Sequence, residues 1–369
     1  MPVTHACKPN IHVHCHALRD VRRLYGPGLR DRVSERLPRL LTGRTALPYG
    51  NGSGVCTPLP LPSHTQGNNM NLQSNLYTLQ IFNTEIIIKT SLPKIINRIV
   101  DLYPTTTSWW KIRSTSRGTI QIDHLQADGL FGEQYSIFAE LECFSHLSRC
   151  ASLTVLLDRI YWYINNLPLY ALPENYYTIH AAAVASARGA ILLPGSSGTG
   201  KSTLTAALVS AGYTYLSDEI AIISDVERSV LPYPKPISLR HKGAEVLKQE
   251  FCDWVAKLNT GDLQYSWEGV LLSPRNYLPA SFQGGFVVSY IIFPFREEQG
   301  IGSYLVPMRR SEALVRLMSQ LISLRRNDST SRNIEKMVQL IRQSKCYALR
   351  VGTLRSAVAC IDRLLGDTA

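Results

Sequence analysis

The sequence predicts an α/β protein organised around a phosphate-binding loop, and two observations support this prediction. Residues 195–202 read GSSGTGKS, which fits the pattern G-x-x-x-x-G-K-[ST]. A short apolar run at 190–193 has the length of a buried strand, and apolar residues after the loop recur at helical spacing. Gly212 then stands where a helix end is expected. Strand, loop and helix in this order distinguish a phosphate-binding loop from a chance Gly/Ser-rich turn.

The residue types of the loop explain its expected chemistry. Its glycines let the chain curl, so that successive backbone N–H groups point at phosphate oxygens. Lys201 reaches the β- and γ-phosphates as a positive charge, and the hydroxyl of Ser202 is a ligand for Mg²⁺. The sequence therefore predicts ATP and Mg²⁺ as cofactors. The predicted nucleotide-binding residues are Gly195, Ser196, Ser197, Gly198, Thr199, Gly200, Lys201, Ser202 and Thr203.

The composition is that of a globular protein with room for two domains. The chain has 369 residues, of which 45% are hydrophobic and 18% are charged. No apolar run reaches the roughly 18 residues needed to cross a bilayer, so no membrane span is expected. The eight cysteines include no C-x-x-C pair, which argues against a zinc ribbon and a disulfide framework. Free cysteines beside an ATP-type site predict a cytoplasmic location.

The net charge of +11 is concentrated near the N-terminus. Residues 1–69 hold nine basic and three acidic residues and are rich in Pro, Gly and His. We expect this segment to be a disordered tail or a start-site extension. A histidine cluster at residues 12–16 lacks the second ligand cluster that a metal site needs. Because the other 300 residues carry only +5, we expect no nucleic-acid partner.

Two folded parts are expected after the tail. Residues 70–175 have the pattern of a small α/β domain for accessory contacts or substrate recognition. Trp109 and Trp110 are expected in its core, with a peptide-binding surface as the alternative. Residues 176–369 form a second α/β domain that contains the loop. Its predicted strands are 179–185, 190–193, 219–223, 286–293 and 346–351, and its predicted helices are 202–211, 311–324, 331–341 and 354–365.

Two adjacent acids form the second motif. Asp218 lies 17 residues after Lys201, and Glu219 follows it at the edge of an apolar run. Acids inside a core usually serve an ion or a proton transfer. Beside a phosphate loop, one carboxylate helps to hold Mg²⁺ and the other accepts the proton of an attacking hydroxyl. The short spacing, and the absence of a Leu-Ser-Gly-Gly-Gln signature, argue against a transporter-type ATPase.

Taken together, these residues resemble the catalytic domain of the HPr kinase/phosphorylase family. The resemblance covers residues 176–365 and rests on IHAAA at 179–183, the loop, and GYTYLSDE at 212–219. The segment LPYPKPISLR at 231–240 is similar to the HPr kinase-related proteins of peptide-modification gene clusters. Some of those proteins phosphorylate a serine of a lasso-peptide precursor. The glycine-rich signature that HPr kinase/phosphorylase carries after its acidic pair is missing here.

The resemblance implies roles for individual residues. It makes His180 an active-site residue near the γ-phosphate, with a buried histidine at a strand start as the alternative interpretation. It makes Asp218 the general base and Glu219 a metal-linked neighbour, so that Ser202 and Glu219 are the implied metal ligands. In this family the second acid is an aspartate, so Glu219 is a departure. Residues 235 and 240, a lysine and an arginine, are candidates for contacts to phosphate or substrate.

The expected protein has an HPr kinase-like P-loop kinase domain, residues 176–369, and a smaller N-terminal α/β domain. We expect ATP-dependent phosphorylation of a Ser/Thr hydroxyl on a peptide or small protein, such as a ribosomally made precursor peptide. One alternative is a small-metabolite kinase. Another is a non-catalytic nucleotide-binding module of a biosynthetic complex, which the intact set of Lys201, Ser202 and Asp218 argues against, because a scaffold has no need of a base. The sequence leaves the formation of a homo-oligomer open.

Overall fold

The computed structural model describes residues 75–103, 116–125, 134–141, 144–233, 235–258, 263–265, 269–274, 284–296, 302–322 and 330–366. Within them the chain is a mixed α/β protein with three sheets and eight helices, which confirms the predicted α/β class. These residues belong to one compact unit. No helix among them is long and apolar enough to cross a membrane. The predicted tail, residues 1–69, and Trp109 and Trp110 lie outside the described residues.

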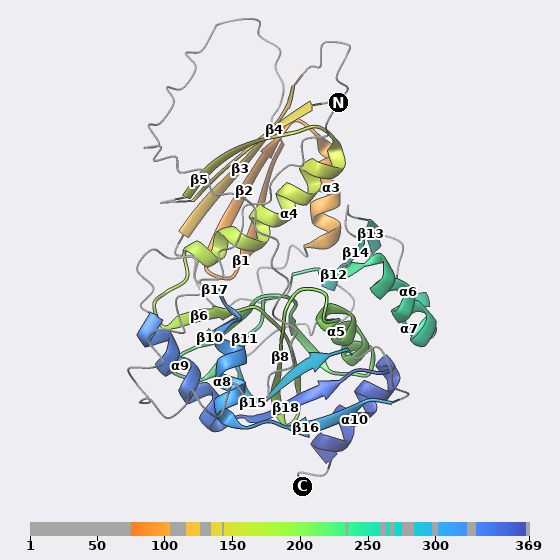
Figure 1. Cartoon of the computed structure of the whole chain (residues 1–369). Helices are drawn as coiled ribbons and strands as arrows, with labels where there is room; N and C mark the ends of the chain where they lie inside the picture. The colour runs from red at the N-terminus through yellow and green to blue at the C-terminus, as the bar shows by residue number, and fades with distance from the viewer. Residues whose placement is uncertain are drawn as a thin grey trace, which may run out of the picture. The chain divides into compact units, whose positions relative to one another are not determined.

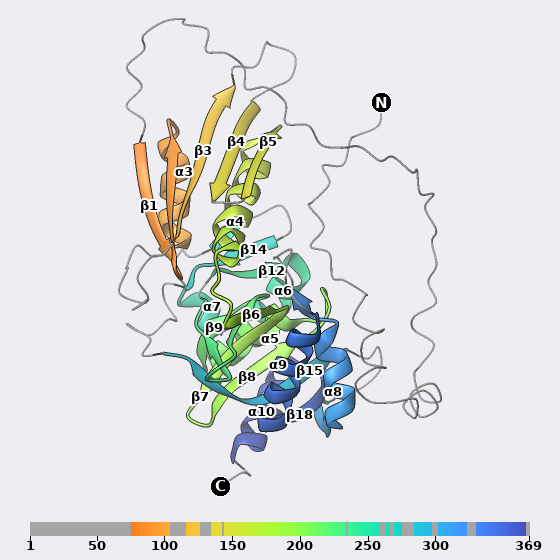
Figure 2. The ribbon, with the colours of Figure 1, turned by 90° about the vertical axis from the view of Figure 1, so that its left-hand side faces the viewer.

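The first sheet has five strands in the order β1-β2-β3-β4-β5 (Figure 1). Neighbouring strands are antiparallel except β2 and β3, which are parallel and connected through helix α3. Helices α3 and α4 lie along this sheet and share its core (Figure 1, Figure 2). The elements are β1 (Asn75–Ile81), β2 (Thr84–Thr90), α3 (Pro93–Leu102), β3 (Ser116–Leu125), β4 (Gln134–Leu141), β5 (Phe144–Cys150) and α4 (Leu153–Tyr170).

The second sheet has ten strands, and β8, β15 and β18 form its parallel centre. Their residues are mostly apolar and buried, as expected for parallel strands that are covered on both faces. Helices α5 and α10 pack in one core with this sheet, while α8 and α9 pack on each other and against β18 and β15. The strands are β6 (Tyr176–Ile179), β7 (Ala181–Ser186), β8 (Gly189–Pro194), β9 (Thr214–Ser217), β10 (Ala221–Ser224), β11 (Ser229–Leu231), β15 (Phe286–Phe295), β16 (Tyr304–Pro307), β17 (Leu321–Ile322) and β18 (Lys345–Arg350).

A third, three-stranded sheet has the order β12-β14-β13 and carries two helices between β12 and β13. Helix α6 of this segment packs against α5, which brings the segment to the loop of residues 195–202. The elements are β12 (Ile237–Arg240), α6 (His241–Glu250), α7 (Cys252–Ala256), β13 (Leu263–Tyr265) and β14 (Gly269–Leu272). The remaining helices are α5 (Lys201–Ser210), α8 (Arg310–Met318), α9 (Thr330–Gln343) and α10 (Leu354–Gly366).

Helix α5 ends at the predicted glycine. Gly212 has φ +98°, a left-handed conformation that glycine adopts without strain. The N–H groups of Gly212 and Tyr213 donate to the carbonyls of Val209 and Leu208 at 3.0 and 3.1 Å. This pair of bonds is the Schellman motif, which satisfies the last helical carbonyls.

Three predicted elements differ from the structure. The predicted strand 179–185 is divided at His180, because β6 pairs with β10 and β17 whereas β7 pairs with β8 and β9. Glu219, predicted at the start of a strand, lies in a turn before β10. The predicted helix 311–324 ends at Met318, because residues 321–322 pair with β6 as strand β17. Strand pairing with distant residues overrides the local pattern at His180 and at residues 321–322, whereas the positive φ of Glu219 excludes this residue from the strand.

Candidate active site

The predicted phosphate-binding loop, residues 195–202, lies at the carboxyl ends of two parallel strands. Strand β8 ends at Pro194, just before the loop, and its parallel neighbour β15 ends just before Arg296. Ligands of α/β sheets usually bind at these ends of the strands. Gly198 and Gly200 have φ of +89° and +91°, which only glycine adopts readily. Gly200 caps α5, so the positive end of the helix dipole is at the loop.

Lys201 folds against the inside of the loop. Its Nζ donates to the carbonyl oxygens of Gly195 and Ser196 at 2.6 and 2.9 Å. The residue lines a cavity of about 340 Å³ although it is only 5% exposed. Burial lowers the pKa of the amine, and the charges of Asp218 and Glu219 oppose this shift. The amine therefore lies beside the backbone amides that would surround a phosphate group.

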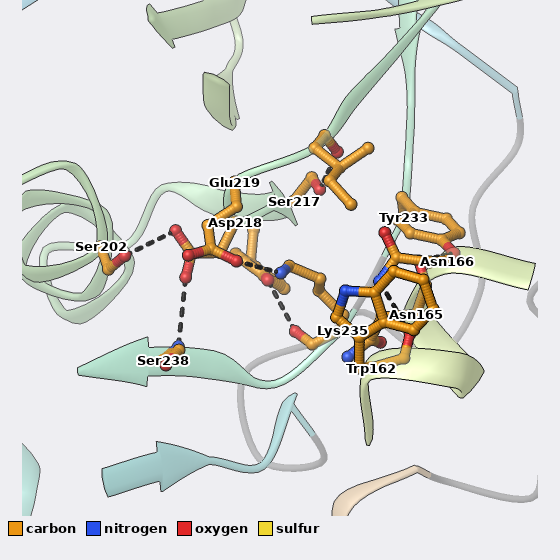
Figure 3. A network of polar contacts seen from close by, with 12 residues as sticks. Trp162, Asn165, Asn166, Ser202, Ser217, Asp218, Glu219, Tyr233, Lys235 and Ser238 are labelled. Carbon is orange, nitrogen blue, oxygen red and sulfur yellow. Dashed lines mark hydrogen bonds and ion pairs between the residues drawn. The ribbon is translucent and has the colours of Figure 1, made fainter. Parts of the chain in front are cut away.

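Asp218 is fully buried, and its carboxylate lies between Ser202 and Ser238 (Figure 3). Its Oδ1 accepts a hydrogen bond from Ser202 Oγ at 2.9 Å, and its Oδ2 accepts one from the backbone N–H of Ser238 at 3.1 Å. Burial raises the pKa of Asp218 to about 6, with a smaller contribution from the charge of Glu219. Asp218 does not line the cavity, so it reaches the cavity through Ser202.

Glu219 is turned into the cavity by a strained backbone. Its φ is +66°, and the N–H of Ile220 donates to the carbonyl of Asp218 at 2.9 Å, which closes a three-residue γ-turn. Such a conformation costs about 1–3 kcal/mol in a residue with a side chain and is found mainly at functional sites. Its Oε2 accepts a hydrogen bond from Lys235 Nζ at 2.7 Å (Figure 3). This ion pair holds the pKa of Glu219 well below its usual range, so the carboxylate is ionised.

His180 reaches the same cavity from the junction of β6 and β7. Its backbone N–H donates to the carbonyl of Gln320 at 2.7 Å, which fixes the start of β7. Burial lowers the pKa of the imidazole, and the charge of Lys201 adds to this shift, so the ring is neutral at pH 7. The structure thus brings His180, Lys201 and Glu219 to one cavity, and their catalytic roles stay predictions.

Three further cations line the cavity, and they come from β12, from α6 and from the residue directly after β15. Arg240, at the end of β12, donates from Nη2 to Ser197 Oγ at 2.9 Å, and Lys242 follows in the first turn of α6. Arg296 lies beside Gly200, where an added methyl group would be 3.5 Å from Arg296 Nε. Within the described ranges, no carboxylate is in ion-pair distance of these three cations. The cavity therefore has an excess of positive charge.

Sequence reasoning misses Ser238, Lys242 and Arg296. Ser238 acts through its backbone N–H, for which a sequence holds no side-chain signal. Arg296 could have been found from its position directly after a buried strand, because ligands of parallel sheets bind at the carboxyl ends of the strands. Lys235, a candidate for phosphate contacts, does not line the cavity and pairs with Glu219, whereas Arg240 does line it.

The residues of the cavity fit a polyphosphate and a magnesium ion. A helix N-terminus, the loop amides and four cations suit a phosphate tail. The hydroxyl of Ser202 and the carboxylate of Asp218 are hard oxygen ligands, and Mg²⁺ typically takes one or two protein oxygens plus phosphate and water oxygens. In the part of the chain that the structure describes, no group of three or more His, Cys, Asp or Glu side chains could hold a metal by itself. A magnesium ion here would therefore depend on the nucleotide.

No protein-family model matches the chain, and no curated protein matches it either.

Proposed function

We propose that this protein is a kinase that transfers the γ-phosphoryl group of ATP to a Ser/Thr hydroxyl of a peptide or small protein. The observation that carries the proposal is the composition of one cavity. A phosphate-binding loop, four cations and an ionised carboxylate line the same space. The cations suit the charge of a transferring phosphoryl group, and the carboxylate suits an acceptor hydroxyl. The peptide acceptor follows from the resemblance of residues 176–365 to HPr kinase-like proteins.

In this proposal, different cations bind different parts of the phosphate tail. Lys201 and the loop amides bind the β- and γ-phosphates, while Arg240 and Arg296 flank the loop beside Gly198 and Gly200. Mg²⁺, when bound, offsets negative charge on the phosphate oxygens. Such fixed charges stabilise the transition state because they need no reorganisation during transfer.

The geometry favours a division of roles between the two carboxylates that is the reverse of the sequence prediction. Asp218 is buried and bonded to Ser202, which suits the metal side of the site. Glu219 is the carboxylate that lines the cavity, so it is the one that an acceptor hydroxyl can reach. The raised pKa of Asp218 argues for the opposite assignment. Reach decides between the two carboxylates, because a proton acceptor must first be close to the hydroxyl, and phosphoryl transfer demands little basicity.

In the proposed reaction the acceptor oxygen forms a bond to the γ-phosphorus, and the bond to the β–γ bridging oxygen of ATP breaks. Glu219 orients the hydroxyl and takes its proton, and ADP leaves with the bridging oxygen. His180 is neutral and lies in the same cavity, where it contributes a hydrogen bond rather than a charge.

The proposal is tested by incubating the protein with MgATP and a panel of serine and threonine peptides, with phosphoryl gain read by mass. The expected result is one added phosphoryl group on some peptides. Glu219→Gln should lower kcat for that peptide, whereas Asp218→Asn should mainly raise the Mg²⁺ requirement. A swapped pair of effects would restore the sequence-based roles. ATP-dependent labelling of free metabolites, with no response to any peptide, would favour a small-metabolite kinase.

A further inference from the structure

The carboxylate that lines the cavity is bound by a lysine that lies outside it. Lys235 is 7% exposed, and its Nζ is 2.7 Å from Glu219 Oε2. Among the described residues, no other carboxylate is in ion-pair distance of this lysine. A buried ammonium group is costly unless it is paired. Glu219 therefore holds the lysine in place, and the lysine in turn holds Glu219 at the centre of a strained turn.

The backbone of Lys235 is fixed on both sides. Its N–H donates to the carbonyl of Tyr233 at 2.8 Å, and its carbonyl accepts a hydrogen bond from the hydroxyl of Tyr215 at 2.6 Å. Both tyrosine side chains are fully buried. The flexible lysine side chain therefore has a fixed origin and a fixed end at Glu219 (Figure 3).

Tyr233 connects this fixed point to helix α4. Its hydroxyl donates to the backbone carbonyl of Asn165 at 2.9 Å (Figure 3). The side chain of Asn165 accepts a second hydrogen bond, at 3.0 Å, from Tyr103 at the end of α3. The ring of Tyr233 also shares an apolar cluster with Phe82 and Leu169, which belong to the part of the chain before residue 176. The contacts thus run from α4 through Tyr233 and Lys235 to Glu219.

We propose that Lys235 is a positioning residue that keeps Glu219 directed into the cavity, and that Tyr233 anchors this lysine on helix α4. The inference rests on the proposed function, because it takes Glu219 as the group that meets the acceptor hydroxyl. According to this inference, the part of the chain before residue 176 contributes to the geometry of the active site. Helix α4 supplies the support against which the reactive carboxylate is oriented.

The first test compares Lys235→Met with Lys336→Met. Lys336 is a matched control, because it is similarly buried, pairs with Asp225 at 3.5 Å and lies outside the cavity. Lys235→Met should lower kcat for the selected peptide by on the order of a hundredfold, while MgATP affinity changes by less than about threefold. Lys336→Met should change neither, and Lys235→Arg should restore part of kcat because it keeps the charge.

A double-mutant cycle separates positioning from general structural damage. In a Glu219→Gln protein, adding Lys235→Met should lower kcat by no more than about twofold, because the lysine acts through the glutamate. Full additivity of the two losses would contradict the inference.

The anchoring by Tyr233 is tested separately. Tyr233→Phe should lower kcat by several-fold, while Tyr213→Phe should not. Tyr213 is the matched control, since it is also buried and donates to Asp362 at 2.6 Å, away from the cavity.

A measurement that does not depend on catalysis distinguishes a failure of this inference from a failure of the proposed function. Amide hydrogen exchange of Ile220 reports opening of the turn that holds Glu219. It should become at least about tenfold faster in Lys235→Met and stay unchanged in Lys336→Met. If no peptide is phosphorylated by the wild-type protein but exchange responds as expected, the proposed function fails and the positioning of Glu219 stands. Unchanged exchange at Ile220 in Lys235→Met would overturn the inference.

Discussion

Replacing Asp218 by Asn should make the protein more stable, while its Mg²⁺ requirement for phosphoryl transfer rises. Asparagine keeps the size of the side chain and can still accept from the N–H of Ser238, while its amide can donate to Ser202 Oγ. What it removes is a fully buried charge. The pKa of Asp218 is raised from 3.8 to about 6 in the folded protein. Each pH unit corresponds to about 1.4 kcal/mol, so the ionised carboxylate destabilises the folded state by about 3 kcal/mol.

The sign and the pH range of this effect follow from the raised pKa. The folded state binds the proton of Asp218 more tightly than the unfolded chain does, so the penalty is absent below about pH 4 and complete above about pH 6. Asp218→Asn should therefore be more stable than wild type by up to about 3 kcal/mol at pH 8, and by about half of that at pH 5.

The assay is urea unfolding between pH 5 and 8, in a metal chelator and without nucleotide. Asp225→Asn is the matched control, because Asp225 is a partly exposed carboxylate that pairs with Lys336, and its removal should not stabilise the protein. The account of Asp218 as a buried charge that destabilises the folded state would be refuted in two cases. One is an Asp218→Asn variant that is less stable than wild type at pH 8, and the other is a difference in free energy of unfolding that does not change with pH.

Two further predictions concern packing. Gly243→Ala would place a methyl carbon 2.6 Å from Thr203 Oγ1, so it should destabilise the protein by about 1–3 kcal/mol and weaken MgATP binding. Adding Thr203→Ala should relieve this strain, and the control Gly366→Ala, with nothing within 4 Å, should be neutral in thermal unfolding. A chain shortened to residues 176–369 should melt well below the full chain, because it loses Phe82, Leu169 and Leu172 from a shared apolar cluster. Equal melting temperatures would show that the two parts are independent.

The local pattern predicts the centre of the second sheet well. The strands at 190–193 and 346–351 and the helices at 202–211 and 354–365 each agree with the structure within about two residues. Each has a strong apolar period or run and an end signal such as Gly212. Helix α3 was not predicted, although Pro93 at its first turn is a helix-start signal. The predicted boundary near residue 175 stays a prediction.

The residues themselves predict the site best where neighbouring positions in the sequence form it, whereas His180 and Arg240 are indicated by the family resemblance. The loop and the acidic pair are each a continuous stretch of the sequence, so their residues can be identified from the sequence. Arg296 and Lys242 reach the cavity through sheet order and through the packing of α6 on α5, which no local pattern encodes. The sequence predicts a strand at Glu219, because the residues that follow are apolar and nothing in the sequence marks a positive φ at a glutamate.

The central claim is that one cation-rich cavity binds the phosphates of ATP, and calorimetric titration of MgATP tests it most directly. The variants to compare are Lys201→Ala, Arg296→Gln and, as a matched loss of charge, Arg188→Gln. Arg188 is exposed in the turn at the far end of β8 from the loop. We predict saturable one-site binding that Lys201→Ala and Arg296→Gln each weaken by about tenfold or more, while Arg188→Gln stays within about twofold of wild type. Folded wild-type protein that shows no saturable MgATP binding, or an equal loss of affinity in Arg188→Gln, would contradict the account.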